Sequence, residues 1–194
     1  MSPWFAKASV LALIVLQFVV RVPFAMRAEK AKVATSRRGP LEVALLGLVT
    51  LGYLVLPILA IVTPFFSFAD HSLTPIAFGA GLAVAVLGLW LCYRSHADLG
   101  DNWSVTLELK ESHRLVTTGV YRRVRHPMYT GLFLTAVAQA LLLPNWFAGP
   151  SYLVAFAVLF ALRVGPEEQM MREQFGQEYE DYARRTKRLV PGVF

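Results

Sequence analysis

The stretch that decides the fold is HPMYTGLFLTAVAQALLLPNWFAGPSYLVAFAVLFAL, residues 126–162, which contains no Asp, Glu, Lys or Arg. As a single helix it would be roughly 55 Å long, almost twice the hydrocarbon thickness of a bilayer, about 30 Å. It must therefore turn back on itself. The helix-breaking clusters Pro144-Asn145-Trp146 and Gly149-Pro150 mark the turn. The sequence thus predicts a tight helical hairpin with arms at residues 127–143 and 146–163.

Three further charge-free blocks precede the hairpin, at residues 8–20, 43–69 and 71–93. A membrane span needs about 20 apolar residues. The first block is short, but Lys7 and Arg21 can extend their charged ends towards the interface, so that residues 4–26 can cross. Hydrophobic residues make up 56% of the chain and charged residues only 16%, against roughly 25% in soluble domains. We therefore expect an all-α, polytopic membrane protein with five transmembrane helices.

The distribution of basic residues predicts the orientation. With the N-terminus outside, the external segments are residues 1–7, 65–74 and 144–150, and of the 19 Lys and Arg residues only Lys7 falls there. Cytoplasmic loops collect basic residues, so the C-terminus should be cytoplasmic. The alternative is a cleaved signal peptide at residues 1–25. Cleavage would invert every later loop and is disfavoured by the same charges.

Two polar segments, residues 94–125 and 164–194, cannot lie in lipid and should both face the cytoplasm. We expect one membrane domain, 1–194, in which 1–93 forms three spans and 94–194 carries the chemistry. In the tail, Pro166 suits the first position of a helix. The positions that follow at helical spacing are Met170, Met171, Phe175, Tyr179 and Tyr182. This pattern predicts a cytoplasmic C-terminal helix beginning at Pro166, and the alternative is an interfacial helix without a site.

Several other classes of protein are disfavoured by composition and spacing. The single cysteine, Cys92, excludes a disulfide scaffold and a Cys-ligated metal site. The four histidines, at positions 71, 96, 113 and 126, do not have the spacing of a standard metal site. The basic runs 122–125 and 184–188 lack interleaved aromatic residues, so they fit a membrane surface better than nucleic acid. We expect neither a bound metal nor a nucleic-acid partner.

The densest group of polar and aromatic residues is GVYRRVRHPMYTG, residues 119–131. Pro127 should begin a helix there, and the N–H groups of its first turn suit a carboxylate or phosphate. His126 and Tyr129 are three residues apart, so they should lie on one side of this helix start. Gly131 would let a neighbouring helix approach closely. The alternative is a basic membrane flank with an interfacial tyrosine and no site.

A second group is Arg163 with Glu167 and Glu168. Arg163 ends the charge-free hairpin, and a helical path would bring Glu167, four residues later, next to it. Ionisable groups at membrane depth are costly and are functional candidates by default. The alternative is a snorkelling arginine followed by the acidic first turn of a helix.

The ordered set of motifs resembles the isoprenylcysteine carboxyl methyltransferase family. The set comprises HRLVTTGVY (113–121), RHPMYTG (125–131), Arg163 with Glu167-Glu168, and FGQEYEDY (175–182). The resemblance covers roughly residues 94–188 and implies a compact, prokaryotic, integral membrane enzyme. Such an enzyme methylates the C-terminal carboxylate of a prenylated cysteine, using S-adenosylmethionine in a cytoplasmic pocket of the catalytic half.

The resemblance also implies roles for individual residues. The catalytic residues would be Arg163 and Glu167, with Arg163 meeting the substrate. The cofactor would contact His113, Arg114, Leu115, Val116, Tyr121, His126, Pro127, Met128, Tyr129 and Glu167. Thr106 falls where the family has a polar cofactor contact, although the surrounding sequence departs from the pattern. The implied partners are a prenylated cysteine with its tail in the bilayer and membrane lipids, with no obligate protein partner.

The chemistry of the residues is compatible with this reaction. A carboxylate is already a nucleophile, so the enzyme needs desolvation and alignment rather than a general base. An arginine at the membrane rim can hold a carboxylate in a bidentate fork. Three alternatives stay open: a different lipophilic acceptor (an amine, a thiol or a phospholipid headgroup), a reduced-nicotinamide reductase, and a non-enzymatic membrane scaffold.

Overall fold

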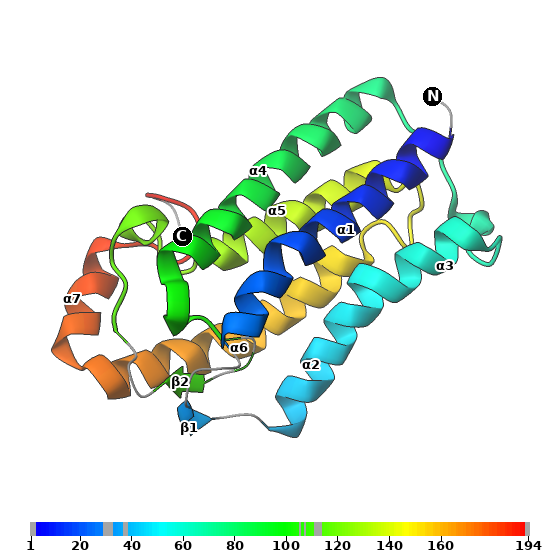
Figure 1. Cartoon of the computed structure of the whole chain (residues 1–194). Coiled ribbons are helices and arrows are strands. Elements are labelled where there is room, and N and C mark those ends of the chain that lie inside the picture. The colour runs from blue at the N-terminus through cyan, green and yellow to red at the C-terminus, as the bar shows by residue number, and fades with distance from the viewer. Residues whose placement is uncertain are drawn as a thin grey trace.

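The computed structural model describes residues 3–28, 33–36, 39–104, 106, 108–110 and 114–192. It consists of long helices aligned along one axis, with a short helix and a small sheet at one end (Figure 1). The helices are α1 (Pro3–Ala28), α2 (Pro40–Thr50), α3 (Leu56–Val62), α4 (Pro75–Leu99), α5 (Pro127–Leu142), α6 (Ser151–Phe175) and α7 (Gln177–Arg185). A π-helical turn, η1 (Leu51–Val55), joins α2 to α3 without a break.

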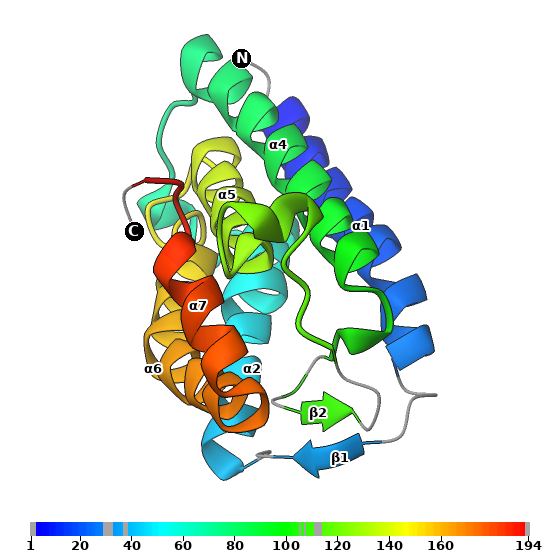
Figure 2. The same cartoon turned by 90° about the vertical axis from the view of Figure 1, so that its left-hand side faces the viewer.

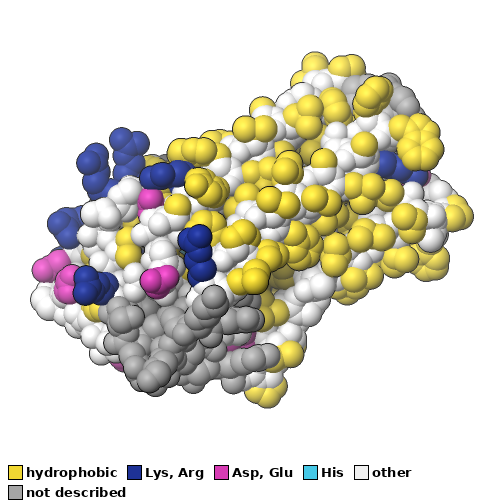
Figure 3. Space-filling view, viewed as in Figure 1, with side chains coloured by type: hydrophobic (Ala, Val, Ile, Leu, Met, Phe, Trp, Pro, Cys, Tyr) yellow, Lys and Arg dark blue, Asp and Glu magenta, His cyan; other side chains and the backbone are white. Residues whose placement is uncertain are grey.

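Three helical segments are long and apolar enough to cross a membrane: Trp4–Ala28, Pro40–Val62 and Pro75–Asn102. A shorter apolar helix, Pro127–Leu142, follows them. Yellow hydrophobic side chains cover the long helices in the space-filling view, whereas charged side chains gather at the end that carries α7 (Figure 3). The chain is therefore an integral membrane protein with several apolar helices, as predicted.

The predicted turn between the two hairpin arms lies where the breaker residues placed it. Buried Asn145 organises it, because its Oδ1 accepts from the backbone N–H of Ala148 (2.8 Å) and its Nδ2 donates to the Phe66 carbonyl (2.7 Å). The second arm begins at Ser151 rather than at Trp146. The reason is that the residues between them form the turn itself.

The apolar loop before α4 and the hairpin turn lie side by side at one end of the bundle. The backbone N–H of His71 donates to the Pro144 carbonyl (3.0 Å), and that of Trp146 donates to the Ala69 carbonyl (2.9 Å). The small sheet and α7 lie at the opposite end (Figures 1 and 2). The two loops predicted to be external thus share one end of the molecule.

Close contact between α4 and α5 depends on glycine. A Cβ atom added at Gly131 would lie 2.8 Å from the Cys92 Sγ atom, and one added at Gly88 would lie 2.9 Å from the Thr135 Cγ2 atom. Both distances are shorter than a van der Waals contact. The predicted role of Gly131 in close helix approach is confirmed, and Gly88 provides the matching space on α4.

The prediction that a helix begins at Pro166 is wrong. Helix α6 passes through Pro166 without a break and continues to Phe175. Proline removes one intrahelical hydrogen bond, but Val164 and Glu168 on either side of it are buried, and their packing keeps the helix continuous. The helix ends instead at Gly176, whose φ of 51° lies in the left-handed region that glycine favours. The expected C-terminal helix is the shorter α7.

Besides the helices, the described residues form a small two-stranded sheet, and one of its strands comes from the polar segment between α4 and α5. Strand β2 (Glu108–Lys110) pairs antiparallel with β1 (Val33–Ser36), with Thr35 opposite Leu109 (Figure 2). Two 3-10 turns, η3 (Gly100–Asn102) and η4 (Gly119–Arg122), flank β2. This sheet was not predicted, because such short strands give no recognisable alternation.

Candidate functional site

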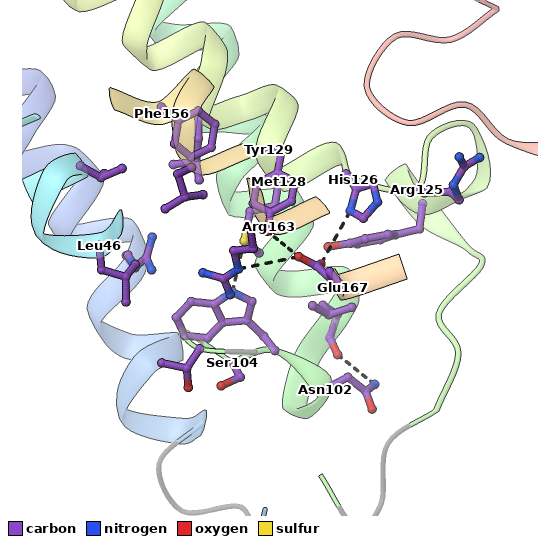
Figure 4. Close-up of a pocket in the computed structure, with 18 of the residues that line it drawn as sticks. Leu46, Asn102, Ser104, Arg125, His126, Met128, Tyr129, Phe156, Arg163 and Glu167 are labelled. Atoms are coloured by element: carbon purple, nitrogen blue, oxygen red, sulfur yellow. Dashed lines mark hydrogen bonds and ion pairs between the residues drawn. The ribbon is translucent and has the colours of Figure 1, made fainter. Parts of the chain in front are cut away.

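A cavity of about 430 Å³ opens among α1, α2, α5, α6 and described residues between α4 and α5, which include Asn102, Trp103 and Arg114. Both apolar and charged side chains line it. The apolar residues include Phe18, Leu46, Val49, Leu132, Phe156 and Leu159, and the polar and charged residues include Asn102, Ser104, Arg125, His126, Arg163 and Glu167. In Figure 4, Leu46 and Phe156 lie on one side of the Arg163 guanidinium, and Glu167, His126 and Arg125 lie on the other. The cavity can therefore hold a ligand that is apolar at one end and charged at the other.

Two aromatic side chains at the start of α5 face Glu167 of α6. The Tyr129 hydroxyl donates to the Glu167 Oε2 atom at 2.5 Å, and the His126 Nδ1 atom lies 3.7 Å from the Glu167 Oε1 atom. The rings of His126 and Tyr129 are stacked, with centroids 5.4 Å apart. Both side chains thus lie on one side of the helix start, as their spacing predicted (Figure 4).

Arg163 lies between two carboxylates. Its Nε atom is 3.9 Å from the Glu167 Oε2 atom, so the predicted pairing along the helix is confirmed. Its Nη1 atom is 3.5 Å from the Oε1 atom of Glu42, a buried residue in the first turn of α2. Glu42 was not among the predicted site residues. The available signal was an acidic residue next to a predicted span, where a carboxylate needs a cationic partner.

Glu168 points away from the cavity into a group of cationic side chains. Its Oε1 atom lies 3.2 Å from His126 Nε2 and 3.1 Å from Arg125 Nε, and its Oε2 atom lies 2.9 Å from Arg188 Nη2. Burial alone would raise the pKa of this carboxyl, but the hydrogen bonds from His126 and Arg188 and the charge of Arg125 hold the pKa well below its usual range. Glu168 therefore fixes one edge of the His126 ring while the other edge faces Glu167.

Hydrogen bonds hold the C-terminal segment against the start of α5. The backbone N–H of His126 donates to the Arg188 carbonyl (3.0 Å), and Thr130 Oγ1 donates to the Leu189 carbonyl (2.8 Å). The Tyr182 hydroxyl of α7 donates to the Tyr121 carbonyl (2.7 Å). Burial, together with the Glu167 carboxylate, raises the pKa of the Tyr121 hydroxyl well above its usual range, so this hydroxyl stays protonated.

Most residues singled out by the motifs come together in this cavity. Its lining includes Thr106, Arg114, Leu115, Val116, Tyr121, His126, Met128, Tyr129, Arg163 and Glu167. Pro127 is buried behind the lining, where it begins α5. His113 lies outside the described residues. Binding of a cofactor by these residues stays a prediction.

The structure adds lining residues from the first half of the chain, where the sequence offered no motif. Helix α1 contributes Gln17 and Arg21, and η1 contributes Tyr53. The Arg21 guanidinium carbon lies 5.3 Å from the centroid of the Trp103 ring. Arg21 could have been singled out as a charged residue within an apolar helix. The other two depend on contacts between helices that are distant in sequence.

Comparison with known proteins identifies the segment that carries this cavity's polar part. The profile of the isoprenylcysteine carboxyl methyltransferase (ICMT) family matches residues 81–173. Protein-S-isoprenylcysteine O-methyltransferase B of Arabidopsis thaliana is 34% identical over 119 residues, covering 58% of each chain. The Tribolium castaneum and human protein-S-isoprenylcysteine O-methyltransferases are 35% and 34% identical over 115 residues. Each of these matches covers 58% of this chain, and 41% and 40% of those relatives.

A solved structure gives the same result for the fold. The structure is that of the eukaryotic intramembrane Ras methyltransferase, isoprenylcysteine carboxyl methyltransferase. The match covers 78% of this chain and 50% of the solved chain, with a TM-score of 0.55 and 28% sequence identity. The chain thus spans about half the length of the relatives it matches. The matched segment, which runs from the middle of α4 almost to the end of α6, is thus similar to the isoprenylcysteine carboxyl methyltransferase family, as the motifs predicted.

Proposed function

We propose that this protein transfers a methyl group from S-adenosylmethionine to the C-terminal carboxylate of a prenylated cysteine. The observation that carries the proposal is the position of Arg163, whose guanidinium lies between the apolar Leu46 and Phe156 and the polar Glu167 and His126 (Figure 4). An acceptor with a lipid tail and a terminal carboxylate matches this arrangement. Its tail would contact the apolar side chains, and its carboxylate would contact Arg163. The names of the relatives support this choice of acceptor over an amine, a thiol or a phospholipid headgroup.

The polar part of the cavity suits the methyl donor. When bound, the donor supplies a methyl group activated by a positively charged sulfur. Glu167 provides a carboxylate for that charge, and the aromatic residues Tyr129 and Trp103 line the same cavity. Residues Arg114–Val116 also line the cavity. A hydrogen bond from the Arg114 backbone N–H to the Asn102 Oδ1 atom (2.9 Å) holds this segment in place.

The side chains have to align and desolvate the reactants rather than move a proton. In the transfer, an oxygen of the acceptor carboxylate bonds to the methyl carbon as the carbon–sulfur bond breaks and its electron pair stays on sulfur. Arg163 would hold the acceptor through its planar guanidinium, while Glu42 and Glu167 fix the orientation of that group. The apolar walls exclude water from the reacting atoms.

Calorimetry on the detergent-purified protein tests the proposal. S-adenosylhomocysteine should bind, and a reduced nicotinamide nucleotide should not. Binding of the nicotinamide nucleotide alone would favour a reductase, and binding of neither would favour a membrane scaffold.

Two substitutions at the start of α5 should weaken the donor site. His126→Ala removes the ring stacked on Tyr129, and Tyr129→Phe removes the hydrogen bond to Glu167. Loss of a hydrogen bond to a charged group costs roughly 1.5–3 kcal/mol, so the affinity for S-adenosylhomocysteine should fall about tenfold to a hundredfold. Affinity for a prenylcysteine should change less. An unchanged S-adenosylhomocysteine affinity in folded His126→Ala protein would remove His126 from the site.

We also propose that the chain crosses the membrane five times, with the N-terminus outside and the cavity's polar end in the cytoplasm. The three long apolar helices and the hairpin α5–α6 would supply the crossings, and residues 94–194 would form the catalytic half. Because α5 is short, its crossing relies on local thinning of the bilayer.

Cysteine labelling tests this topology, since native Cys92 is buried and should not react. Thr118→Cys, at the charged end, and Phe68→Cys, in the loop before α4, both introduce thiols at exposed positions. A membrane-impermeant maleimide should label Phe68→Cys in intact cells and Thr118→Cys only after lysis. Labelling of both from the same side would contradict the five-span arrangement.

A further inference from the structure

Arg21 brings a positive charge into the cavity from the apolar helix α1. It lines the cavity together with Arg163, and its guanidinium lies against the face of Trp103. Among the residues whose side chains the structure describes, no carboxylate lies within ion-pair distance of Arg21. A cation at this depth is costly, so a charge kept there without an anionic partner is a functional candidate.

Two other cations that line the cavity, Arg163 and Arg125, have carboxylate partners, and the third, Arg114, is exposed to solvent, so Arg21 differs from all of them. Arg163 lies near Glu42 and Glu167, and Arg125 contacts Glu168 at 3.1 Å. Arg21 lines the same cavity as Arg163, but no described carboxylate lies near it in this way. The described lining therefore contains no anion that compensates Arg21.

A second observation points to a polar ligand on this face of α1. Gln17 lies one helical turn before Arg21 and also lines the cavity, although its side chain is only 6% exposed. Its Nε2 atom donates to the Tyr152 hydroxyl at 3.4 Å, but its Oε1 atom has no hydrogen-bond partner in the described part of the chain. Leaving a buried acceptor unsatisfied costs about 1–3 kcal/mol, so this face is better suited to a polar ligand than to lipid alone.

We propose that Arg21 is a second substrate-binding residue, which holds the acceptor's carboxylate together with Arg163. This inference rests on the proposed function and adds a residue from outside the family segment. Stacking on Trp103 keeps the planar guanidinium in place, so little conformational freedom is lost when an anion binds. Methylation removes the negative charge. Arg21 should therefore favour the acid over its methyl ester and assist release of the neutral product.

The test compares a farnesylcysteine analogue as the free acid and as its methyl ester. Affinities of both, and of S-adenosylhomocysteine, are measured on wild type, Arg21→Gln and Arg21→Lys. The matched control is Arg27→Gln, which removes an exposed positive charge from the same helix outside this cavity. Wild type should prefer the acid. Arg21→Gln should bind the acid about tenfold to a hundredfold more weakly, with the ester and S-adenosylhomocysteine unchanged.

The ratio of acid to ester affinity separates binding from a merely structural role, because a structural defect would weaken both ligands alike. An unchanged ratio in Arg21→Gln, or a ratio that falls equally in Arg27→Gln, would overturn the assignment. If Arg21→Gln does not fold, Arg21→Lys is the deciding variant. Loss of the planar guanidinium should still lower the ratio of acid to ester affinity severalfold. An unchanged ratio would contradict the role of Arg21.

The two proposals fail in different ways. If wild type methylates the acid while Arg21→Gln keeps the wild-type ratio, the role of Arg21 is wrong and the proposed function stands. If wild type prefers the acid through Arg21 but transfers no methyl group, the proposed function is wrong and the carboxylate site stands. No preference for the acid in wild type would overturn both.

Discussion

Arg163→Lys should lower turnover of a prenylcysteine acid by about a hundredfold or more, a loss typical of a reactant held out of alignment. A guanidinium has five N–H donors in a rigid plane, so it can contact Glu42, Glu167 and the acceptor together. A lysine ammonium keeps the charge but cannot reproduce this geometry. Affinity for S-adenosylhomocysteine should stay near the wild-type value. Methyl transfer and cofactor binding on the purified variant provide the two measurements.

Arg172→Lys is the matched control for this prediction, because it makes the same exchange on the same helix at a side chain that is 44% exposed. Its turnover should equal that of wild type. If Arg163→Lys methylates at the wild-type rate at every acceptor concentration, the arginine does not clamp a carboxylate. An acceptor without a carboxylate would then be the better interpretation.

Glu168→Gln should destabilise the protein by about 3–5 kcal/mol, the cost of removing one partner from a buried charge cluster. Glu168 is 1% exposed and receives hydrogen bonds from Arg125 and Arg188. These contacts tie the C-terminal segment to the start of α5, so their loss should also loosen the donor site. Thermal unfolding in detergent, followed by loss of the monodisperse elution peak, measures the effect.

The pH dependence of this effect follows from the pKa of Glu168, which is lower in the folded protein than in the unfolded chain. The stabilisation is complete above the usual range of a glutamate and is lost as the pH falls towards the folded value. The difference between wild type and Glu168→Gln should therefore shrink at acidic pH. Glu180→Gln, which breaks the exposed pair with Arg172, should cost at most about 1 kcal/mol. An equal loss in both variants would contradict the role of Glu168.

The sequence could predict the hairpin and much of the cavity, because these depend on local patterns. A long charge-free stretch interrupted by Pro144 and Gly149 has few ways to fit a bilayer. The approach of Arg163 to Glu167, and of His126 to Tyr129, follows from helical spacing. The family motifs then added the segment at residues 114–116, which has no periodic pattern of its own.

Contacts between distant segments could not be predicted in this way. Glu42 and Arg163 meet because α2 packs on α6, and Arg21 meets Trp103 because η3 folds back towards α1. Pro166 misled the prediction, since proline is common at helix starts but is tolerated inside a helix held by its packing. Each of these outcomes depends on tertiary packing rather than on local propensity.

The most direct test of the central claim is the fate of a labelled methyl group. Purified protein is incubated with S-adenosylmethionine carrying a radioactive methyl group and with a farnesylcysteine analogue, and the product is treated with base. We predict label in the prenyl product that base releases as volatile methanol, as expected of a methyl ester. Label that stays with the product after base treatment would indicate an amine or thioether, and no transfer at all would contradict the proposed activity.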